Sequence, residues 1–415
     1  MIKETFDWLE NISQPDKASS NPGYTISTDG VNTYATNNKS GKVDFKETDA
    51  TTVFNRAFNT LPNGGKVLTM PGTFDIKSNP MPKSNIEWIG SGISTILNLV
   101  GISTVMIHGV HNVRMSNMLT QSFGNNVSNI QIKDNCKNIS IDNVTINQMG
   151  TLTALSTPYN GGFGIFLVVS QPINYIDTVS ITNCNINGNG GNDLIGGGTW
   201  FSVNLSNINN FGTIRNINIS NNKIVHTLVL SDYDSCFDMV GINLTKFDNN
   251  ICNGIVQFGW EQYPTRSSQI TNNIISPAYP HNYKKKYASI NVLVSSAATL
   301  PYTNLDILNN TINNGQIYIL GQHGAYVSSS NINDNTISAP ASINAMDLTY
   351  LSASNVKNNM VSGGATCINL NNCKGLTITG GNLANANIGI NGNNNSISNI
   401  ISNIGFTNVK TQTVA

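Results

Sequence analysis

The chain has 415 residues, more than most single globular domains, so it either divides into domains or repeats one unit whose core grows with length. Charged residues make up 11% of the sequence, against about a quarter in an average protein, and the formal net charge is zero. Because basic stretches interleaved with aromatic residues are also missing, the composition argues against nucleic-acid binding and suits a neutral partner rich in hydroxyl groups.

The N-terminal stretch shows no targeting signal. It reads MIKETFDWLENISQ, with charged and polar residues where a secretory signal peptide has an apolar core. The longest apolar run, GIFLVV from Gly164, is too short to span a bilayer, so no membrane insertion is expected. We assign residues 1–48 to an N-terminal segment.

A short amphipathic helix is predicted over residues 49–61. Asp49 or Thr51 can serve as its N-cap, and Val53, Ala57 and Leu61 recur at helical spacing. The end of a stack of strands leaves backbone groups unpaired, so we expect this helix to cap the repeats that follow it.

From about residue 128 a short phrase recurs, in which aliphatic positions flank an asparagine pair. Equivalent aliphatic residues follow one another at intervals of 22 to 27 residues, as in the steps Ile224–Ile251, Ile251–Ile275, Ile312–Ile337, Ile337–Val361 and Val361–Leu383. This period, with strand-like alternation inside each unit, predicts the coils of a β-solenoid. The asparagines are expected to adopt left-handed turn geometry and to hydrogen-bond with their equivalents in the next coil.

The six cysteines do not form a metal or redox motif. They are scattered without a CxxC pair, at Cys136, Cys184, Cys236, Cys252, Cys367 and Cys373. We expect them to be buried inside the coils, with a Cys367–Cys373 bridge as the alternative.

The segment from Asp49 to Ile76, DATTVFNRAFNTLPNGGKVLTMPGTFDI, resembles the N-terminal cap and first strands of the pectate-lyase-like superfamily. The resemblance implies an all-β, right-handed parallel β-helix (a β-solenoid) with a short N-terminal capping α-helix, which we place at residues 49–415. The superfamily includes polysaccharide lyases, glycoside hydrolases, epimerases and viral tailspikes, so the resemblance does not name a reaction. Related spikes are often trimers, and a homotrimer is therefore among the expectations.

In relatives the sugar usually lies along the strand after the asparagine-containing segment. The resemblance implies the same wall here, formed by the stretches that begin at Gly164, Trp200, Cys236, Gly254, Ala288, Gln316, Ala341, Ala365 and Asn387. Asparagines are expected to face outward from it at Asn204, Asn243, Asn291, Asn344 and Asn369. They form either a hydrated amide ladder or a set of sugar contacts.

Carboxylates are scarce, yet four gather in the middle of the wall: Asp232, Asp234, Asp238 and Glu261. Glu261 follows Asp234 by 27 residues, the interval between Ile224 and Ile251, so we expect the two in neighbouring coils. Equivalent side chains there lie about 5 Å apart and diagonal ones about 7 to 8 Å, separations that include those of both retaining and inverting glycosidases. Trp260 would raise the pKa of Glu261 and make it the general acid, with Asp234 as nucleophile or base.

Two alternatives for these carboxylates stay open. They can satisfy loop amides, or the aspartates can hold Ca²⁺ in a lyase whose base is Lys246, Arg266 or one of Lys284 to Lys286. No lyase signature surrounds them, and of the polygalacturonase pattern only Asn192-Asp193 is present, without the DD pair or GHG. We expect no cofactor, with Ca²⁺ only under the lyase alternative.

Aromatic residues near the same coils can stack on the apolar faces of pyranose rings. With Arg266 they form the predicted substrate-binding set: Trp200, Tyr233, Trp260, Tyr263 and Tyr318. The alternative is that about half of the aromatic side chains only cover strand ends.

The sequence thus predicts an extracellular or virion-associated β-helix of the tailspike or depolymerase type. It binds a cell-surface polysaccharide along its wall, and if it is an enzyme we expect a glycoside hydrolase before a polysaccharide lyase. The alternative is a non-catalytic receptor-binding or adhesive protein, such as a viral spike or fibre.

Overall fold

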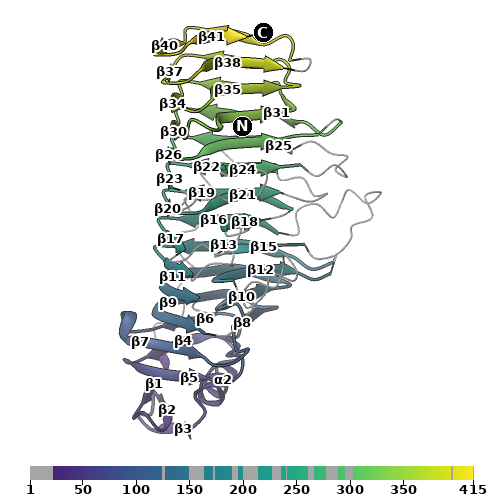
Figure 1. Ribbon diagram of the computed structural model, residues 1–415. Helices are drawn as coiled ribbons and strands as arrows, with labels where there is room; N and C mark the ends of the chain where they lie inside the picture. Colours follow the sequence, from purple (N-terminus) through teal and green to yellow (C-terminus); the bar gives the residue numbers. More distant parts are fainter. Residues whose placement is uncertain are drawn as a thin grey trace. The chain divides into compact units, whose positions relative to one another are not determined.

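The computed structural model describes residues 22–123, 127–148, 163–171, 173–188, 195–199, 214–226, 235–239, 241–259, 266–276, 288–294, 302–322, 324–393 and 396–414. The chain forms two compact units. The N-terminal unit comprises residues 1–204 and 213–228, and the C-terminal unit comprises residues 205–212 and 229–415. Each unit is a stack of coils built from short parallel β-strands (Figure 1). Within the described residues, the helices are too short and too polar to cross a lipid bilayer.

The N-terminal unit begins with strands that precede the predicted helix. β1 (Pro22–Thr28), β2 (Thr33–Asn37) and β3 (Val43–Glu47) form an antiparallel meander, and β1 also pairs in parallel with β4 (Gly65–Thr69). The part of residues 1–48 that the structure describes is therefore joined to the sheet of the first coil. The assignment of residues 49–415 to a single β-helix domain stays a prediction.

The predicted capping helix is present as α2 (Ala50–Asn59). Its N-cap is Asp49, whose carboxylate accepts hydrogen bonds from the backbone N–H groups of Thr51 at 3.1 Å and Thr52 at 3.2 Å. The apolar face of α2 is buried, and the Phe54 ring packs 5.6 Å from Phe74 and 5.1 Å from Trp88. Because these aromatic side chains are fully buried, α2 covers the core of the first coils.

The remaining strands of the N-terminal unit follow in chain order: β5 (Gly72–Ile76), β6 (Ile86–Ile89), β7 (Thr95–Leu99), β8 (Val105–His108), β9 (His111–Ser122), β10 (Ile130–Lys133), β11 (Cys136–Gln148), β12 (Ile165–Val169), β13 (Ile176–Thr182), β14 (Asn185–Gly188), β15 (Ile195–Thr199), β16 (Ile214–Ser220) and β17 (Lys223–His226). A single 3₁₀ turn, η1 (Gly92–Ser94), precedes β7. β6, β9, β11, β13 and β16 stack in parallel along one face, and β8, β10, β12 and β15 along another.

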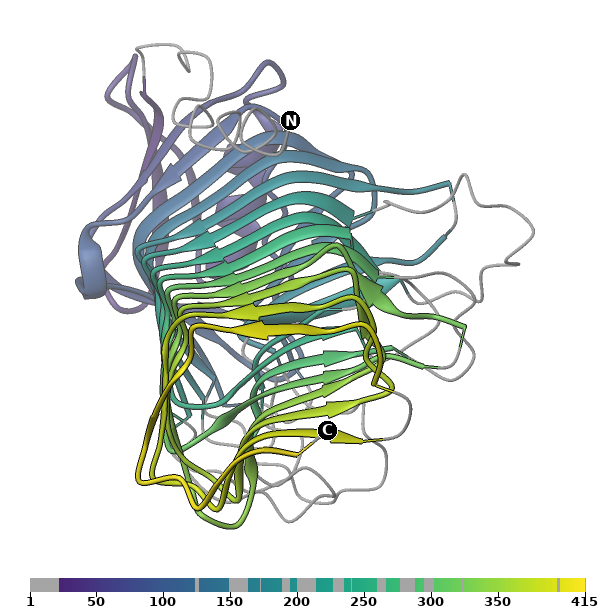
Figure 2. The same cartoon turned by 90° about the horizontal axis from the view of Figure 1, so that it is seen from above.

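The C-terminal unit has three rows of parallel strands. The first, which we call the wall sheet, contains β18 (Ser235–Met239), β21 (Ile255–Gly259), β24 (Ala288–Leu293), β27 (Gln316–Leu320), β31 (Asn344–Thr349), β35 (Thr366–Asn371), β38 (Ile388–Asn393) and β41 (Thr411–Val414). The second contains β19 (Ile242–Asp248), β22 (Arg266–Thr271), β25 (Tyr302–Leu308), β28 (Val327–Ser328), β29 (Asn331–Asn333), β32 (Leu351–Ser352), β33 (Asn355–Lys357), β36 (Thr377–Thr379) and β39 (Ile400–Ser402). The third contains β20 (Ile251–Cys252), β23 (Ile274–Ile275), β26 (Thr311–Asn313), β30 (Thr336–Ala339), β34 (Met360–Gly363), β37 (Asn382–Ala384) and β40 (Gly405–Thr407). Seen from above in Figure 2, the strands of each row lie over one another.

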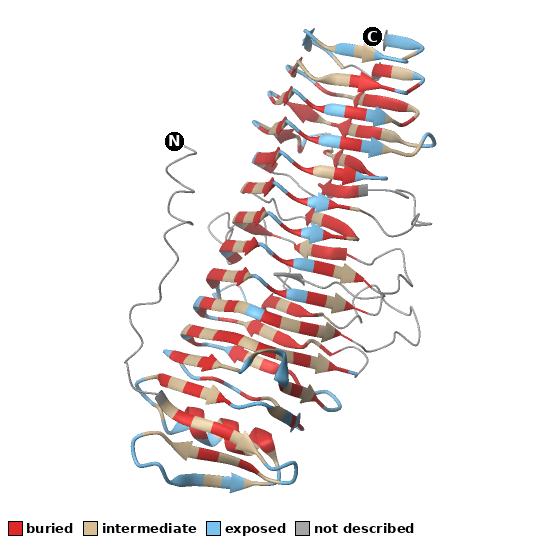
Figure 3. Ribbon diagram, turned by 90° about the vertical axis from the view of Figure 1, so that its left-hand side faces the viewer, coloured by how far each residue is buried: buried red, intermediate tan, exposed pale blue. Residues whose placement is uncertain are grey.

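The register of the third row confirms most of the predicted aliphatic steps. Ile312 pairs with Ile337, Ile337 with Val361, and Val361 with Leu383, and all four side chains are buried. The step from Ile251 to Ile275 was wrong by one residue, because Ile251 pairs with Ile274 and is 51% exposed. Both residues of each of these short strands are apolar, and alternation turns only one inward. Figure 3 shows the same mixture of buried and exposed residues along the strands of the stacked coils.

The two residues of each asparagine pair have different roles, and both roles were predicted. The first residue of each pair has left-handed backbone geometry, with φ between 52° and 58° at Asn249, Asn272, Asn309, Asp334 and Asn358. The second residue is buried and bonds to its equivalent in the next coil, in a row that we call the asparagine ladder: Asn250, Asn273, Asn310, Asn335 and Asn359. The prediction of left-handed turns and of amides joined between coils is confirmed.

Each amide of the asparagine ladder makes several hydrogen bonds. Asn310 Oδ1 accepts from the backbone N–H of Asn273 at 3.0 Å and from its Nδ2 at 2.9 Å. Asn310 Nδ2 in turn donates to Asn335 Oδ1 at 3.0 Å and to the carbonyl oxygen of Ile270 at 2.8 Å. The ladder therefore satisfies backbone groups at the buried turn as well as its own amides.

The cysteines are interior residues, as expected. All six are buried and unbridged, so the alternative Cys367–Cys373 disulfide is not formed. Burial raises the pKa of the Cys184 thiol to about 12 and that of Cys367 to about 11. These thiols stay protonated near neutral pH and act as small apolar side chains.

Candidate functional site

The wall sheet presents one polar side chain at the same position of seven successive strands. We call this row the polar ladder: Asp238, Gln257, Asn291, Tyr318, Asp347, Asn369 and Asn391. The first six ladder residues, from Asp238 to Asn369, each lie between buried apolar neighbours, such as Ile317 and Ile319 on either side of Tyr318. Because side chains alternate along a strand, the ladder residues point away from the core.

Three amide hydrogen bonds along the polar ladder run in the same direction. Asn391 Nδ2 donates to Asn369 Oδ1 at 2.9 Å, and Asn369 Nδ2 donates to Asp347 Oδ1 at 2.9 Å. Asn291 Nδ2 likewise donates to Gln257 Oε1 at 2.8 Å. Each of these three asparagines therefore gives one N–H to the preceding coil. Tyr318 lies between Asn291 and Asp347 in the register.

Tyr318 is the aromatic member of the polar ladder. Burial raises the pKa of its phenol to about 12, and the charge of Asp347 adds to this rise. The hydroxyl group is therefore protonated at neutral pH and can donate a hydrogen bond. Its register neighbours are Asn291 and Asp347.

Both neighbours of Tyr318 offer acceptor atoms. Asn291 is 5% exposed, and its buried Oδ1 has no hydrogen-bond partner within the described part of the chain. The carboxylate of Asp347 is held by Asn369 Nδ2 at 2.9 Å and by Asn344 Nδ2 at 3.3 Å. The ring is therefore flanked by an amide oxygen and a carboxylate.

Charge on the wall sheet is sparse and of one sign. Its eight strands contain the carboxylates Asp238 and Asp347 and no lysine, arginine or histidine. Asp238 and Asp347 lie four register steps apart, about 19 Å at the usual strand spacing. They are too far apart to act on one glycosidic bond.

The structure places two of the predicted site residues, Asp238 and Tyr318, on the polar ladder, but they lie three register steps apart, about 14 Å at the usual strand spacing. Seven further predicted site residues lie outside the described part of the chain: Asp232, Asp234, Glu261, Trp200, Tyr233, Trp260 and Tyr263. Arg266 begins β22, which belongs to the second row of strands. Lys246, an alternative lyase base, is on β19 and forms an ion pair with Asp248 at 3.3 Å.

The interval used to place Asp234 beside Glu261 does not apply between the wall strands that adjoin them. β18 and β21 pair with Asp238 opposite Gln257, a step of 19 residues rather than 27. The register of β18 and β21 does not by itself bring Asp234 close to Glu261, so their proximity stays a prediction.

Sequence reasoning missed Gln257, Asp347 and Asn391 as polar residues of the wall. The signal was an aliphatic–polar–aliphatic triplet, which recurs as Val256-Gln257-Phe258, Ile290-Asn291-Val292, Ile317-Tyr318-Ile319, Met346-Asp347-Leu348 and Ile368-Asn369-Leu370. Of the asparagines expected to face outward, Asn291 and Asn369 belong to the polar ladder and Asn344 bonds to Asp347. Asn243 is on β19 instead, and Asn204 is outside the described residues.

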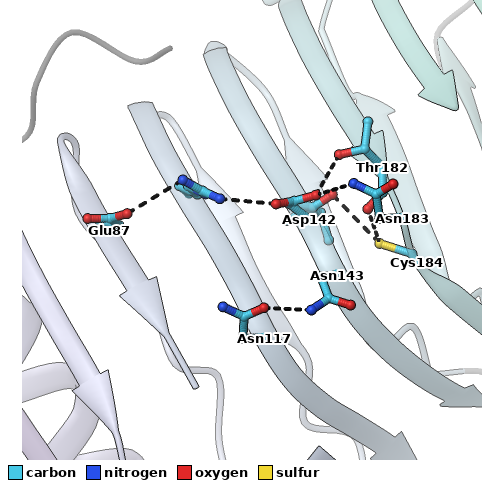
Figure 4. A network of polar contacts seen from close by, with 9 residues as sticks. Glu87, Asn117, Asp142, Asn143, Thr182, Asn183 and Cys184 are labelled. Atoms are coloured by element: carbon cyan, nitrogen blue, oxygen red, sulfur yellow. Dashed lines mark hydrogen bonds and ion pairs between the residues drawn. The ribbon is translucent and has the colours of Figure 1, made fainter. Parts of the chain in front are cut away.

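A second polar cluster, the charged row, crosses the coils of the N-terminal unit. Glu87 forms ion pairs with Lys66 at 3.2 Å and with Arg114 at 3.7 Å, and Arg114 also pairs with Asp142 at 3.0 Å. Figure 4 shows Glu87 on one side of this row and Asp142, Thr182 and Asn183 on the other. The partners are partly exposed and neutralise one another, which is the arrangement of a structural ion-pair network.

Asp142 is the most heavily bonded carboxylate of the charged row. Burial on its own raises the pKa of this carboxyl, but hydrogen bonds from Asn183, Thr182 and Arg114 outweigh burial and lower it. Across the described ranges, no group of three or more histidine, cysteine, aspartate or glutamate side chains could hold a metal ion. The Ca²⁺ alternative involves Asp232 and Asp234, which lie outside those ranges.

No protein-family model matches the sequence, and no curated protein matches it. Among solved structures, the chain is similar to the A-module of the mannuronan C-5 epimerase AlgE4 from Azotobacter vinelandii. The TM-score is 0.53 at 12% identity, over 88% of this chain and 93% of that one. The Dettilon tailspike protein gives a TM-score of 0.50 at 15% identity, over 87% of this chain and 65% of the tailspike chain. The chain has the right-handed parallel β-helix fold.

Proposed function

We propose that this chain is a glycan-binding β-helix of the tailspike or depolymerase type, which holds a cell-surface polysaccharide along the polar ladder. The observation that carries the proposal is the ladder itself, with hydrogen-bonding side chains on seven consecutive strands and one aromatic ring among them. At about 4.8 Å per strand it extends for roughly 30 Å, long enough for several sugar units. Amides and a tyrosine suit hydroxyl groups and the apolar faces of pyranose rings.

The solved structures with this fold support a partner of this kind. One is named for its action on mannuronan, a polysaccharide, and another is a tailspike. The low charge of the whole sequence fits a neutral, hydroxyl-rich polymer better than a nucleic acid. We place the protein outside the cell or on a virion for the same reasons.

We further propose that any cleavage is glycoside hydrolysis by Glu261 as general acid and Asp234 as nucleophile or base. Asp232 and Asp238 lie close to Asp234 in sequence, and Trp200, Tyr233, Trp260, Tyr263 and Arg266 are proposed to contact the sugar with Tyr318. Asp234 precedes β18 by one residue and Glu261 follows β21 by two, so both adjoin the wall sheet in sequence. A lyase reaction using Ca²⁺ ranks below this proposal.

One observation favours binding without cleavage as the second candidate function. The carboxylates of the polar ladder, Asp238 and Asp347, lie too far apart to act on one glycosidic bond. The carboxylate of Asp347 also accepts hydrogen bonds from two amides. A ladder that only holds a glycan needs no carboxylate pair. This candidate is a receptor-binding or adhesive protein.

The experiment combines a binding and a cleavage assay on a panel of bacterial and archaeal surface polysaccharides. We expect at least one glycan to bind, and Tyr318→Ala to weaken that binding about tenfold by removing the ring that stacks on sugar. Release of reducing ends that is lost in Glu261→Gln or Asp234→Asn would establish hydrolysis, and ultraviolet absorbance of unsaturated sugar would indicate a lyase. Binding without release supports the adhesive candidate, and no binding to any glycan contradicts the proposal.

The homotrimer stays a proposal that rests on the resemblance to viral spikes. Light scattering coupled to size-exclusion chromatography tests it, since a trimer has three times the 44.6 kDa mass of one chain. A mass equal to one chain at all concentrations contradicts it.

A further inference from the structure

We infer that the polar ladder around Tyr318 selects a sugar that is uncharged and donates hydrogen bonds, and that it discriminates against uronates. The inference rests on the proposed glycan binding and names the class of glycan. It follows from three features of the described wall: the acceptors beside the ring, the anchoring of the Asp347 carboxylate, and the sign of the charge.

The first feature is that both sides of the Tyr318 ring offer acceptors. Asn291 Nδ2 donates one N–H to Gln257, and Asn291 Oδ1 accepts no hydrogen bond within the described part of the chain. A buried acceptor without a partner is unfavourable, so a hydrogen-bond donor from a ligand is favoured there. A sugar hydroxyl or an acetamido N–H can supply that donor, whereas an ionised carboxylate has none.

The second feature is the anchoring of the Asp347 carboxylate. Asn369 Nδ2 donates a hydrogen bond to it at 2.9 Å, and Asn344 Nδ2 donates another at 3.3 Å. These bonds hold a carboxylate beside the Tyr318 ring, because Asp347 is the register neighbour of Tyr318. The group beside a bound sugar on that side is therefore a hydrogen-bond acceptor.

The third feature is electrostatic. The eight wall strands carry two carboxylates and no cationic side chain. A uronate bound at Tyr318 brings a second negative charge close to Asp347, its register neighbour. Like charges at such separations repel strongly where solvent screening is reduced, and a neutral sugar avoids this repulsion.

The experiment compares uronate-containing surface polysaccharides in native form with the same polymers after chemical reduction of their carboxyl groups to alcohols. The two forms share one backbone and differ in charge and in one hydroxyl donor per uronate. We expect the reduced form to bind about tenfold more tightly than the native form. High salt should narrow the difference, because salt screens the repulsion.

The variants assign the discrimination to Asp347. Asp347→Asn should reduce the preference to about threefold, since it removes the charge and keeps an oxygen acceptor, while Asp347→Glu should restore it. The matched control is Asp306→Asn on β25, whose carboxylate accepts from Asn331 at 2.8 Å and Gln269 at 3.4 Å but belongs to another row of strands. This control should leave the preference unchanged.

The outcomes separate the inference from the function on which it rests. If native polyuronates bind as tightly as their reduced forms, or if Asp347→Asn leaves the ratio unchanged, the inference is wrong and the proposed glycan binding stands. If no polysaccharide binds in any form, the proposed function fails and the inference fails with it. Circular dichroism of each variant shows whether a loss of binding reflects loss of the fold.

Discussion

Each unit has a row of side chains that connects neighbouring coils, and the two rows differ in their chemistry. In the N-terminal unit, Lys66, Glu87, Arg114 and Asp142 form a charged row on a partly exposed face. In the C-terminal unit, the asparagine ladder lies in the interior, with its members at most 3% exposed. Burying an ion costs far more than burying a hydrogen-bonded amide, so the interior uses neutral groups. The charged row should therefore depend on salt and acid in a way that the asparagine ladder does not.

The largest effect should come from the asparagine ladder. Asn310→Ala removes four hydrogen bonds and leaves the backbone N–H of Asn273 and the carbonyl of Ile270 buried without this partner. We expect the free energy of unfolding to fall by about 3 kcal/mol or more. Chemical denaturation followed by circular dichroism measures it.

The matched control for that variant is Asn313→Ala on β26, an exposed asparagine that donates to Ser276 Oγ at 3.1 Å. Its loss should cost about 0.5 kcal/mol or less, as is usual for surface positions. If both substitutions have the same small effect, the asparagine ladder does not stabilise the coils as we describe.

The next largest effect should come from Asp142 in the charged row. Asp142→Ala removes the ion pair with Arg114 and the hydrogen bonds from Thr182 and Asn183. We expect a loss of about 1 to 2 kcal/mol at low salt, because the carboxylate is only partly buried. In about 1 M salt the loss should shrink, whereas the loss for Asn310→Ala should not. Equal salt dependence of the two variants would contradict the comparison.

Acid should weaken the N-terminal unit through the same carboxyl group. Hydrogen bonds lower the pKa of Asp142 on folding despite its burial. Its stabilising contribution is therefore present above its unfolded pKa, about 4, and is lost as pH falls through the lower folded value. The amides of the asparagine ladder do not titrate. Hydrogen exchange from neutral to acidic pH should show faster opening around β11 and β13 than around β26 and β30, and Asp142→Asn should reduce that difference.

The smallest effect should come from the exposed end of the charged row. Lys66 pairs with Glu87 at 3.2 Å, and its side chain is 33% exposed. Lys66→Ala should cost about 0.5 kcal/mol or less, since exposed ion pairs contribute little. A loss comparable to that of Asp142→Ala would mean that the row acts as one cooperative network rather than as separate pairs.

The fold was predictable because its determinants recur along the sequence. The aliphatic steps and asparagine pairs repeat in almost every coil, so errors at single positions do not change the conclusion. The error at Ile251 shows the limit, since two adjacent apolar residues satisfy the pattern equally and only the strand register decides which is buried. The helix was predictable from Asp49 and the apolar spacing after it.

The candidate site was harder to predict because its members are far apart in sequence and individually unremarkable. Attention to clustered carboxylates pointed to Asp232 and Asp234, whereas Asp347 stands alone between two aliphatic residues. Asp347 belongs to the candidate site because the strand register places Tyr318 and Asn369 next to it. The 27-residue interval does not apply between β18 and β21 for a related reason: corner segments differ in length, so an interval measured on one row of strands does not transfer to another.

The distance between successive members of the asparagine ladder is nearly the same for every coil, whatever the number of residues in that coil. Its successive members are 23, 37, 25 and 24 residues apart, yet each amide reaches the next at 2.9 to 3.1 Å. A corner can therefore gain a dozen residues without changing the pitch of the stack, because the added length leaves the ladder positions where they were. Selection can remodel the segments beside the wall sheet, and with them what the wall recognises, while the internal spacing that fixes the coils stays the same.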